Sequence, residues 1–409
     1  MVDALTAQER DVLDLITVDD LQDLTRALVA APGENPPGGE GPTAAVLAAA
    51  CQDRGLRCVV TEVEPERPNV SAVLSGADGP GLLLLGHTDV VPAGDGWTVD
   101  PLGGVVRDGR IYGRGTTDMS GGLAAGVIAM AALKDAGVRL SGPVELAAVV
   151  DEEETGKGVR HYLAAQDRSH FAGCIVVEPT DLQTIIAARG DAYLEFNVTG
   201  RAAHSGNPAD GVNAIYGAAA IVGEIESWHH EMAQDAGHPL VGPPTWNVGQ
   251  VAGGTGTSIV PAHCRVVADR RLLPGETGPE VLAAVRRRVD ALALIDRGLE
   301  VDISLTMEMP GFETAADHLL VRVVGTALAD AGGPGHPCGG WTAACDGGFV
   351  ARDTAVPVLV LGPGSVATKA HHADESVGLE ELLVAARSYA LAAMRLLHPH
   401  DNGTPREDT

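Results

Sequence analysis

The sequence predicts an α/β fold in which a layered domain is interrupted by a smaller α+β domain. Predominantly apolar runs such as 82–85 and 144–150 alternate with Ala- and Leu-rich helical stretches, as in a sheet covered by helices on both faces. After about Gly190 the strands instead alternate apolar and polar residues, which is typical of an antiparallel sheet with one exposed face. From about Phe312 the first pattern returns, so the layered domain is discontinuous.

The elements of the first part follow from periodicity and from Gly and Pro breaks. Glu9–Ala30 predicts one or two amphipathic helices, and Thr43–Cys51 predicts another. Further helices are expected at Met119–Ala136 and Val159–Ala165. The expected strands are Arg57–Val63, Asn69–Leu74, Leu82–Gly86, Val144–Val150 and Cys174–Val177.

The same reasoning divides the rest of the chain. The insert has strands at Tyr193–Val198, Trp246–Val251 and Cys264–Ala268, with helices at Val212–Ile225 and Pro279–Leu292. The last part has a helix at Leu319–Ala331, a strand at Pro357–Leu361 and a closing helix at Leu379–Leu397. The expected boundaries are therefore 1–189 and 309–409 for the layered domain and 190–308 for the insert.

The net charge disfavours several classes of partner, and the cysteine usage indicates the compartment. The 409 residues carry 55 acidic against 28 basic side chains, a formal net charge of -27, which disfavours nucleic acid and anionic membranes as partners. The six cysteines show no C-x-x-C pairing, as expected for free thiols in a reducing cytosol. The first residues lack a basic and apolar leader, and no long uncharged apolar run is seen, so we expect a cytoplasmic protein without a membrane span.

The Gly-rich stretch 112–122 places a single carboxylate, Asp118, where a short strand gives way to a long helix. Glycines permit the positive φ angles of such a turn, and the helix N-terminus favours a negative charge nearby. This position suits a bound cation. Taken alone, however, the stretch favours a helix N-cap aspartate, which is the common use of Asp at this position.

Other acidic and histidine side chains follow the predicted strands in the same way. His87 and Asp89 come after one apolar run, Asp151 to Glu154 after the next, and Glu178 after a third, while His371 follows the last strand. Ligands of open α/β sheets bind at the carboxyl ends of the strands. Two imidazoles and three carboxylates collected there predict a site for two divalent metal ions, Zn²⁺ being the first choice and Co²⁺ or Mn²⁺ the alternatives.

Six short motifs in this order resemble the M20 metallopeptidase family, which includes acetylornithine deacetylase, succinyl-diaminopimelate desuccinylase, aminoacylase-1 and glutamate carboxypeptidase. They are Gly86–Pro92, Gly113–Met119, Asp151–Glu153, Glu178–Thr180, Ala203–Ser205, and Gly362–Gly364 with Ala370–His371. The resemblance covers nearly the whole chain. It implies a discontinuous di-metal hydrolase domain with an inserted lid or dimerisation domain, and a homodimer.

The resemblance also implies which residues bind the metals. His87 and Glu178 would bind one ion, Glu153 and His371 the other, and Asp118 would bridge both. His372 is the alternative to His371, but the family's spacing falls on His371.

The roles of the neighbouring residues follow from the same resemblance. Asp89 would orient the His87 imidazole, its alternative being a turn residue at the strand end. Glu152 would be the general base, taking the proton of the attacking water and passing it to the leaving amine. A shift of one residue, with Glu153 as base and Glu154 as ligand, stays open.

Three residues are implied to contact the substrate. His204 resembles a histidine that reaches over the active site, often from the partner subunit, and stabilises the oxyanion; its alternative is a structural histidine on a loop. Arg271 would bind the substrate carboxylate, with its neighbour Arg270 on the solvent side of the strand. Gly364 would offer backbone groups at the rim of the site. Ser120 and Ser258 depart from the family's usual Lys and Asn, which puts the identity of the substrate in question.

The resemblance implies an acetylornithine deacetylase-like amidohydrolase. It would hydrolyse an N-acyl amino acid to a free amino acid and a carboxylate, with the attacking water between the two metal ions. A dipeptidase or carboxypeptidase is the alternative, and a glutamate at position 178 favours the deacylase and carboxypeptidase branches. A catalytically silent binding protein on this fold would require a lost ligand or base, and none is lost.

Overall fold

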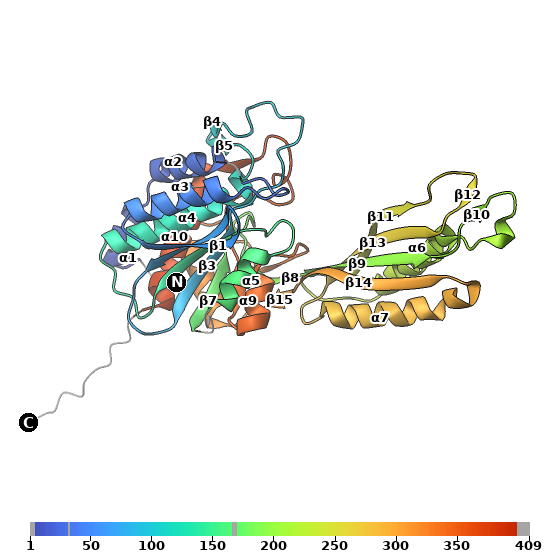
Figure 1. Ribbon diagram of the computed structural model, residues 1–409. Coiled ribbons are helices and arrows are strands. Elements are labelled where there is room, and N and C mark those ends of the chain that lie inside the picture. Colours follow the sequence, from blue (N-terminus) through green and yellow to red (C-terminus); the bar gives the residue numbers. More distant parts are fainter. Residues whose placement is uncertain (1–4, 32, 166–169, 399–409) are drawn as a thin grey trace, which may run out of the picture. The chain divides into compact units, whose positions relative to one another are not determined.

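The computed structural model describes residues 5–31, 33–165 and 170–398, and the chain forms two compact units. The first comprises 1–186, 314–339 and 349–409, and the second comprises 187–313 and 340–348. Figure 1 shows the elements of each unit in sequence colours. Residues 1–4, on which the expectation about a leader partly rests, lie outside the described residues.

The second unit is larger than the predicted insert 190–308 and takes an extra segment. The two ends of its main segment pair with each other, because Phe312 and Glu313 lie opposite Ala188 and Ala187. The segment 340–348 joins it because the amide of Arg189 donates to the carbonyl of Trp341 over 3.0 Å. Backbone pairing between segments far apart in sequence leaves no periodic signal, so the sequence placed these boundaries differently.

A mixed sheet whose central strands are parallel forms the centre of the first unit. Its strand order is β1-β2-β6-β3-β7-β17-β8, with β3 parallel to β6 and β7, and β17 parallel to β7. Every residue of β3 and β6 is buried, which is the outcome that their predominantly apolar sequences predict for strands covered on both faces. The strands are β1 (Arg57–Glu64), β2 (Arg67–Leu74), β3 (Gly81–His87), β6 (Val144–Val149), β7 (Phe171–Val176), β8 (Ile185–Ala188) and β17 (Val358–Val360).

Helices and a small ribbon sheet complete this unit. The predicted helical stretch Glu9–Ala30 forms two helices, each started by a threonine N-cap, Thr6 and Thr17. The three-stranded sheet β18-β5-β4 holds the segment that precedes Asp118. The helices are α1 (Ala7–Asp14), α2 (Val18–Val29), α3 (Gly41–Asp53), the π-helical turn η1 (Thr116–Ser120), α4 (Gly121–Asp135), α5 (Lys157–Ala164), α8 (Leu319–Asp330), α9 (Gly347–Thr354) and α10 (Leu379–Leu396). The ribbon strands are β4 (Val105–Arg107), β5 (Arg110–Tyr112) and β18 (Ser376–Gly378).

Among the residues that the structure describes, one helical stretch, Thr116–Asp135, is long and apolar enough to cross a membrane by length and composition, and 94% of its most apolar window is buried inside the protein. A core helix of a globular domain meets the same criteria, and Thr116–Asp135 is buried in this way.

The second unit is an antiparallel sheet with helices. Its order is β11-β13-β9-β14, and the alternating burial along β13 shows that one face of the sheet is covered, as predicted. The core joins Phe196 and Val266 of the sheet to Ile221 and Val285 of the helices. The elements are β9 (Gly190–Thr199), β10 (Ala203–His204), η2 (Pro208–Asp210), α6 (Ala214–Met232), β11 (Thr245–Gly253), β12 (Ile259–Val260), β13 (His263–Leu272), α7 (Gly278–Ala291), η3 (Leu294–Arg297), β14 (Glu300–Met309), β15 (Phe312–Glu313) and β16 (Gly339–Trp341).

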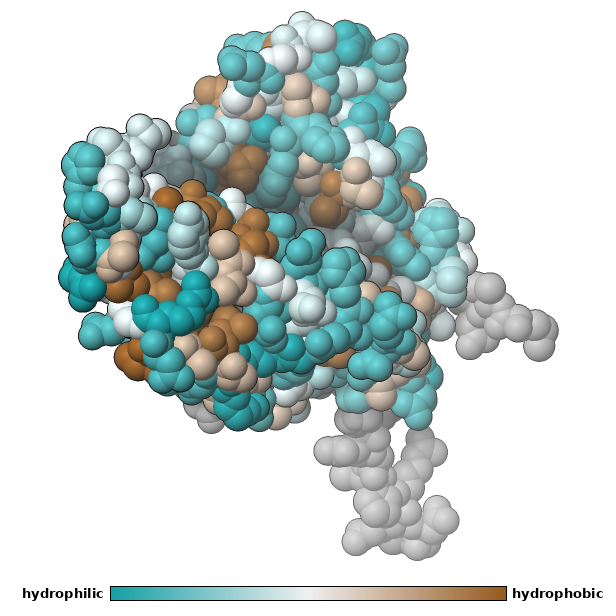
Figure 2. Space-filling view, turned by 90° about the vertical axis from the view of Figure 1, so that its right-hand side faces the viewer, coloured by the Kyte–Doolittle hydropathy of each residue, from teal (hydrophilic) through white to brown (hydrophobic). Residues whose placement is uncertain are grey.

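Hydrophilic residues predominate on the face of the molecule shown in Figure 2, and hydrophobic residues form separate patches among them. Exposed large hydrophobic side chains of the second unit include Ile215, Tyr216, Val251 and Ile259. They lie at the start of α6 and on the strands β11 and β12.

Gly122, at the start of α4, is required by close packing. A Cβ atom there would lie 2.0 Å from the carbonyl oxygen of Val177, which is backbone and cannot move aside. We expect Gly122→Ala to lower the free energy of unfolding by about 1–3 kcal/mol, measured by urea denaturation, because of overpacking. Gly325→Ala is the control: Gly325 lies in α8 with open space around it, so alanine should raise stability by up to about 1 kcal/mol. Equal behaviour of the two variants would contradict this account.

Candidate metal centre

Two neighbouring parallel strands bring His87 and Glu178 together. His87 is the last residue of β3, and Glu178 follows β7, which pairs with β3. The Nε2 atom of His87 lies 3.3 Å from Oε1 of Glu178 and 3.1 Å from Oδ1 of Asp118. All three side chains are buried or nearly so. Parallel register therefore places groups 91 positions apart in the chain within ligand distance of one another.

Asp118 also faces a second imidazole. The Nε2 atom of His371 lies 3.3 Å from Oδ2 of Asp118 and 3.2 Å from Oε2 of Glu153. Each carboxylate oxygen of Asp118 is thus directed at a different histidine, which is the arrangement of a carboxylate shared by two sites. The helix α4 begins at Gly121, beyond Asp118, so the structure does not use Asp118 as an N-cap.

The carboxylate of Glu375 holds the turn that carries Asp118 through hydrogen bonds. One Glu375 oxygen accepts hydrogen bonds from the backbone amides of Thr117 (2.9 Å) and Asp118 (3.1 Å). The other accepts from the amide of Gly115 (3.1 Å) and from the guanidinium of Arg114 (2.5 Å). Gly115 has φ of 80°, the left-handed conformation that glycine adopts without strain. Glu375 follows His371 by four residues, so the same segment supplies both the imidazole and this support.

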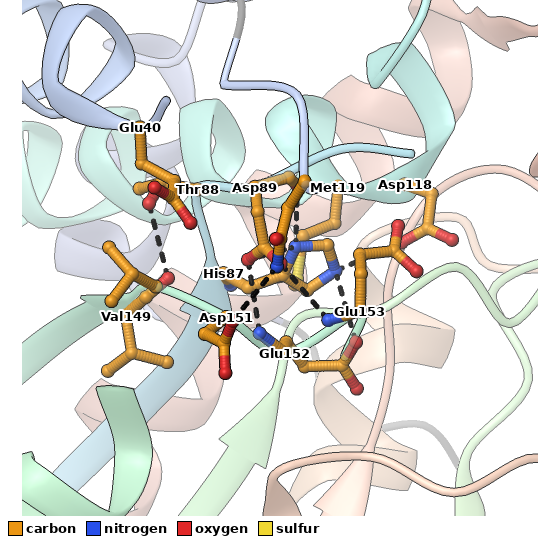
Figure 3. A network of polar contacts seen from close by, with 12 residues as sticks. Glu40, His87, Thr88, Asp89, Asp118, Met119, Val149, Asp151, Glu152 and Glu153 are labelled. Atoms are coloured by element: carbon orange, nitrogen blue, oxygen red, sulfur yellow. Dashed lines mark hydrogen bonds and ion pairs between the residues drawn. The ribbon is translucent and has the colours of Figure 1, made fainter. Parts of the chain in front are cut away.

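Glu152 and Glu153 occupy the turn after β6, as Figure 3 shows. Candidate ligand atoms of His87, Glu152 and Glu178 lie within 4.8 Å of one another, as do those of His87, Asp118 and Glu153. Glu154 is exposed and belongs to neither group, so the structure does not favour the shifted register. In the same way it is the imidazole of His371 that contacts Asp118 and Glu153, although His371 and His372 are both exposed residues.

The carboxylate of Asp89 supports the Glu152–Glu153 turn more directly than it supports His87. It accepts hydrogen bonds from the backbone amides of Glu152 (3.2 Å) and Glu153 (3.0 Å), as Figure 3 shows. Its Oδ1 atom is 3.5 Å from Nδ1 of His87, whereas the backbone oxygen of Asp89 is only 2.8 Å from that nitrogen. The predicted orientation of the imidazole is therefore supplied mainly by the backbone of Asp89, because the strand-end turn places that oxygen closer.

The electrostatics of this cluster are those of crowded, buried charges. Burial and the nearby Asp118 carboxylate raise the pKa of Glu178 to about 7, and the same two causes raise the pKa of Glu153. Hydrogen bonds to Asp118 and Glu153 raise the pKa of His371 to about 10. For His87, burial lowers the pKa, but Glu178 and Asp118 outweigh it, so the pKa is raised well above its ordinary value. The cluster thus favours positive charge at its centre.

These residues fit a pair of borderline divalent ions. The donors are imidazole nitrogens and carboxylate oxygens, the set that Zn²⁺ and its neighbours prefer. Four buried or half-buried carboxylates stand against two imidazoles, and cations between them would relieve the repulsion that raises the pKa values of Glu153 and Glu178.

Comparison with known proteins agrees with this geometry. The sequence pattern of peptidase family M20/M25/M40 matches residues 83–395, which include every residue of the cluster. The chain belongs to this family. It is 32% identical over 316 residues to acetylornithine deacetylase of Photorhabdus laumondii subsp. laumondii, a match that covers 76% of this chain and 78% of the relative.

Solved structures of M20 proteins and other peptidases share the fold. Aminopeptidase PepT from Bacillus cereus superposes with a TM-score of 0.75 at 23% identity, covering 93% of this chain and 99% of the other. Human carnosine dipeptidase 1 gives 0.72 at 17% identity, with 96% and 100% covered. The YXEP protein of Bacillus subtilis, described as a dinuclear metal binding peptidase from the M20 family, gives 0.71 at 17% identity, with 93% and 98% covered.

The resemblance to the M20 family implied three substrate-contacting residues. Gly364 lies in the first unit, and His204 and Arg271 lie in the second. Gly364 belongs to the first unit and has φ of 85°. A Cβ atom there would lie 2.8 Å from the side chain of Thr117, so Gly364 packs beside the turn of Asp118. His204 belongs to the second unit, where it is exposed on β10 and its Nδ1 accepts from the amide of Gly206 over 3.0 Å.

Arg271 lies on β13 of the second unit, opposite Asp191 of β9. Its Nη1 atom is 3.3 Å from Oδ2 of Asp191, and its Nε atom donates to Oδ2 of Asp269 over 3.2 Å. The prediction that Arg270 faces solvent is wrong. Arg270 is buried and binds both oxygens of Glu276, because strand alternation puts it on the covered face of the sheet.

Sequence reasoning missed two supporting residues of the first unit. Glu375 holds the Asp118 turn, and its place four residues after His371 was a usable signal. Asn35, which donates to Asp89 over 3.0 Å, stands in a Gly- and Pro-rich loop that gave no signal.

Removal of Arg114 tests the support beneath Asp118. Arg114→Met leaves the buried Glu375 carboxylate without its cation, and the free energy of unfolding should fall by about 3–5 kcal/mol in urea denaturation. Arg265→Met removes a more exposed pair, with Glu195, and should cost no more than about 1 kcal/mol. Similar small losses for both would show that Glu375 does not need the guanidinium.

Proposed function

We propose that this M20-family protein is a metal-dependent amidohydrolase that converts an N-acyl amino acid, as acetylornithine deacetylase does, to a free amino acid and a carboxylate. The observation that carries the proposal is Asp118, which directs one oxygen at each of two imidazoles, with Glu152 beside them. The 32% identity to a protein named acetylornithine deacetylase supports the class of substrate.

Two divalent ions would be held by the cluster. His87 and Glu178 would bind one, Glu153 and His371 the other, and Asp118 would bind both, with Zn²⁺ the first choice and Co²⁺ or Mn²⁺ the alternatives. When bound, such ions polarise the amide carbonyl and lower the pKa of the attacking water.

Glu152 would move the proton during hydrolysis. Its Oε2 atom lies 3.9 Å from Nε2 of His87, at the edge of the cluster. Its backbone amide is fixed by Asp89, so the carboxylate starts from a defined position. Such a group takes a proton from the attacking water and returns it to the nitrogen of the leaving amine, typically contributing 100- to 10,000-fold (10²–10⁴) in rate.

The second unit would recognise the rest of the substrate. A guanidinium carries five N–H donors, so the contacts of Arg271 with Asp191 and Asp269 leave donors for a substrate carboxylate while fixing the plane of the group. His204, which is exposed on β10, would stabilise the oxyanion, and Gly364 would offer backbone at the rim.

We also propose a cytoplasmic homodimer. All six cysteines are free, as is usual in a reducing compartment. The exposed side chains of Ile215, Tyr216, Val251 and Ile259 on the second unit supply apolar surface of the kind that interfaces between subunits bury.

A substrate screen tests the proposed class. With Zn²⁺ or Co²⁺ added to metal-free protein, N-acetyl, N-succinyl and N-formyl amino acids should be hydrolysed with a higher kcat/KM than dipeptides. The free amine released is the quantity to measure. Higher kcat/KM for dipeptides would instead establish the dipeptidase or carboxypeptidase alternative, and inertness towards every amide would refute both.

Glu152→Gln tests the proton-transfer role. The amide keeps the shape of the side chain but cannot accept the proton, so kcat should fall by about 100- to 10,000-fold while bound metal, measured by atomic emission, is retained. Glu154→Gln, the neighbouring exposed glutamate, should leave kcat unchanged. A normal kcat in Glu152→Gln, or a large loss in Glu154→Gln, would move the base elsewhere.

A further inference from the structure

Buried polar side chains continue from the metal centre into the body of the first unit. Asp89 contacts Asn35, Asn35 contacts Asp151, Asp151 contacts Arg67, and Arg67 contacts Glu40. Figure 3 labels Asp89 and Asp151 beside Glu152 and Glu153, with Glu40 farther from this turn. All five side chains are buried, so their charges and hydrogen bonds must be balanced within the protein.

Asn35 is the only uncharged member of this chain of contacts. Its Nδ2 atom lies 3.0 Å from Oδ2 of Asp89 and 3.1 Å from Oδ1 of Asp151. Both neighbours are carboxylate oxygens, and the amide NH₂ group has two donors, so the orientation of the amide is fixed. One NH₂ group therefore joins two acidic side chains that would otherwise repel each other.

The two carboxylates bound by Asn35 flank and support the Glu152–Glu153 turn. The carboxylate of Asp89 accepts hydrogen bonds from the backbone amides of Glu152 and Glu153. Asp151 immediately precedes them, has φ of 68°, and accepts from the hydroxyl of Thr155 across the turn. The conformation of this turn therefore depends on where the carboxylates of Asp89 and Asp151 are held.

Asn35 is itself anchored to the segment that follows His87. Its backbone amide donates to the carbonyl of Val90 over 2.9 Å, and the amide of Val90 donates to the carbonyl of Gly33 over 3.0 Å. This pairing leaves the Asn35 side chain little freedom to follow Asp89 or Asp151 if either one moved.

Charge balance explains why an amide stands there. The guanidinium of Arg67 pairs with Glu40, lies 2.9 Å from Oδ1 of Asp151 and lies 3.4 Å from Oε2 of Glu64, so it is shared by three carboxylates. Asp89 has His87 as its nearest cationic group, at 3.5 Å. A neutral donor between Asp89 and Asp151 satisfies both without drawing positive charge away from the metal centre.

We propose that Asn35 is a positioning residue for the reaction: by holding Asp89 and Asp151 at hydrogen-bond distance from one amide, it fixes the turn that presents Glu152 and Glu153. The part of this inference that concerns rate rests on the proposed function, while the part that concerns the metal centre does not. Asn35 acts through Asp89 and Asp151, so its loss should affect kcat and metal binding and leave KM unchanged.

The test compares Asn35→Ala with Asn69→Ala in the full-length protein. Asn69 is an equally buried asparagine of the first unit, but its side chain binds backbone groups, the carbonyl of Gly158 (2.8 Å) and the amide of Val150 (3.0 Å). Three quantities are measured: the visible absorption spectrum of the Co²⁺-loaded protein, Co²⁺ affinity by chelator competition, and kcat and KM for the best amide substrate.

Asn35→Ala should change the Co²⁺ spectrum and weaken Co²⁺ affinity or lower kcat by about 10- to 100-fold, the usual cost of losing a group that orients metal ligands. Asn69→Ala should lower thermal stability with the Co²⁺ spectrum unchanged. If Asn35→Ala does not fold, Asn35→Ser, which keeps one donor, replaces it and should show an intermediate change.

Two outcomes overturn the inference. One is a wild-type Co²⁺ spectrum, affinity and kcat in Asn35→Ala. The other is an equal change of the spectrum in Asn35→Ala and Asn69→Ala, which would make Asn35 a structural residue only. Should the wild-type protein hydrolyse no amide, the proposed function fails, and the Co²⁺ spectrum and affinity still decide the role of Asn35.

Discussion

The shared carboxylate of Asp118 is the interaction on which the rest of the site depends. One oxygen faces His87 and the other faces His371, so two sets of ligands from opposite ends of the chain meet at one side chain. That position is maintained because the Glu375 carboxylate accepts hydrogen bonds from three backbone amides of the Asp118 turn and from the guanidinium of Arg114. Movement of the turn by about 1 Å would separate both pairs, and such displacements cost large factors in rate.

Acidic groups gathered at the strand ends repel one another, and other side chains of the first unit partly offset this repulsion. Glu153 and Glu178 have raised pKa values because burial and Asp118 disfavour their charged forms. Behind them, Arg67 and Asn35 distribute positive charge and hydrogen bonds over Glu40, Asp151 and Asp89. Cations would therefore stabilise the metal centre, whereas Asp89, Asp151 and Glu40 already have donors within the protein.

Local pattern predicted the parts of the fold in which neighbours in sequence decide the outcome. The predominantly apolar runs became the buried strands β3 and β6, and the predicted strand Cys264–Ala268 became part of the half-covered strand β13. The alternation also shows why Arg270 was misplaced: it was assigned to the solvent side, but it shares the covered face of β13 with Ala268 and Leu272. The second unit spans 187–313 where the sequence predicted 190–308, because pairing between β8 and β15 extends it at both ends.

Residue type, order and strand-end position are local properties, and from them follow the α/β class, the resemblance to an M20-type family and the candidate ligands His87, Asp118, Glu153, Glu178 and His371. The folded chain was needed to show which oxygen of Asp118 faces which histidine, and that Glu375 and Asn35 hold the turns in place. These contacts join residues 31 to 260 positions apart, and the strength of a hydrogen bond depends on the distance between its atoms in space, which no local pattern encodes.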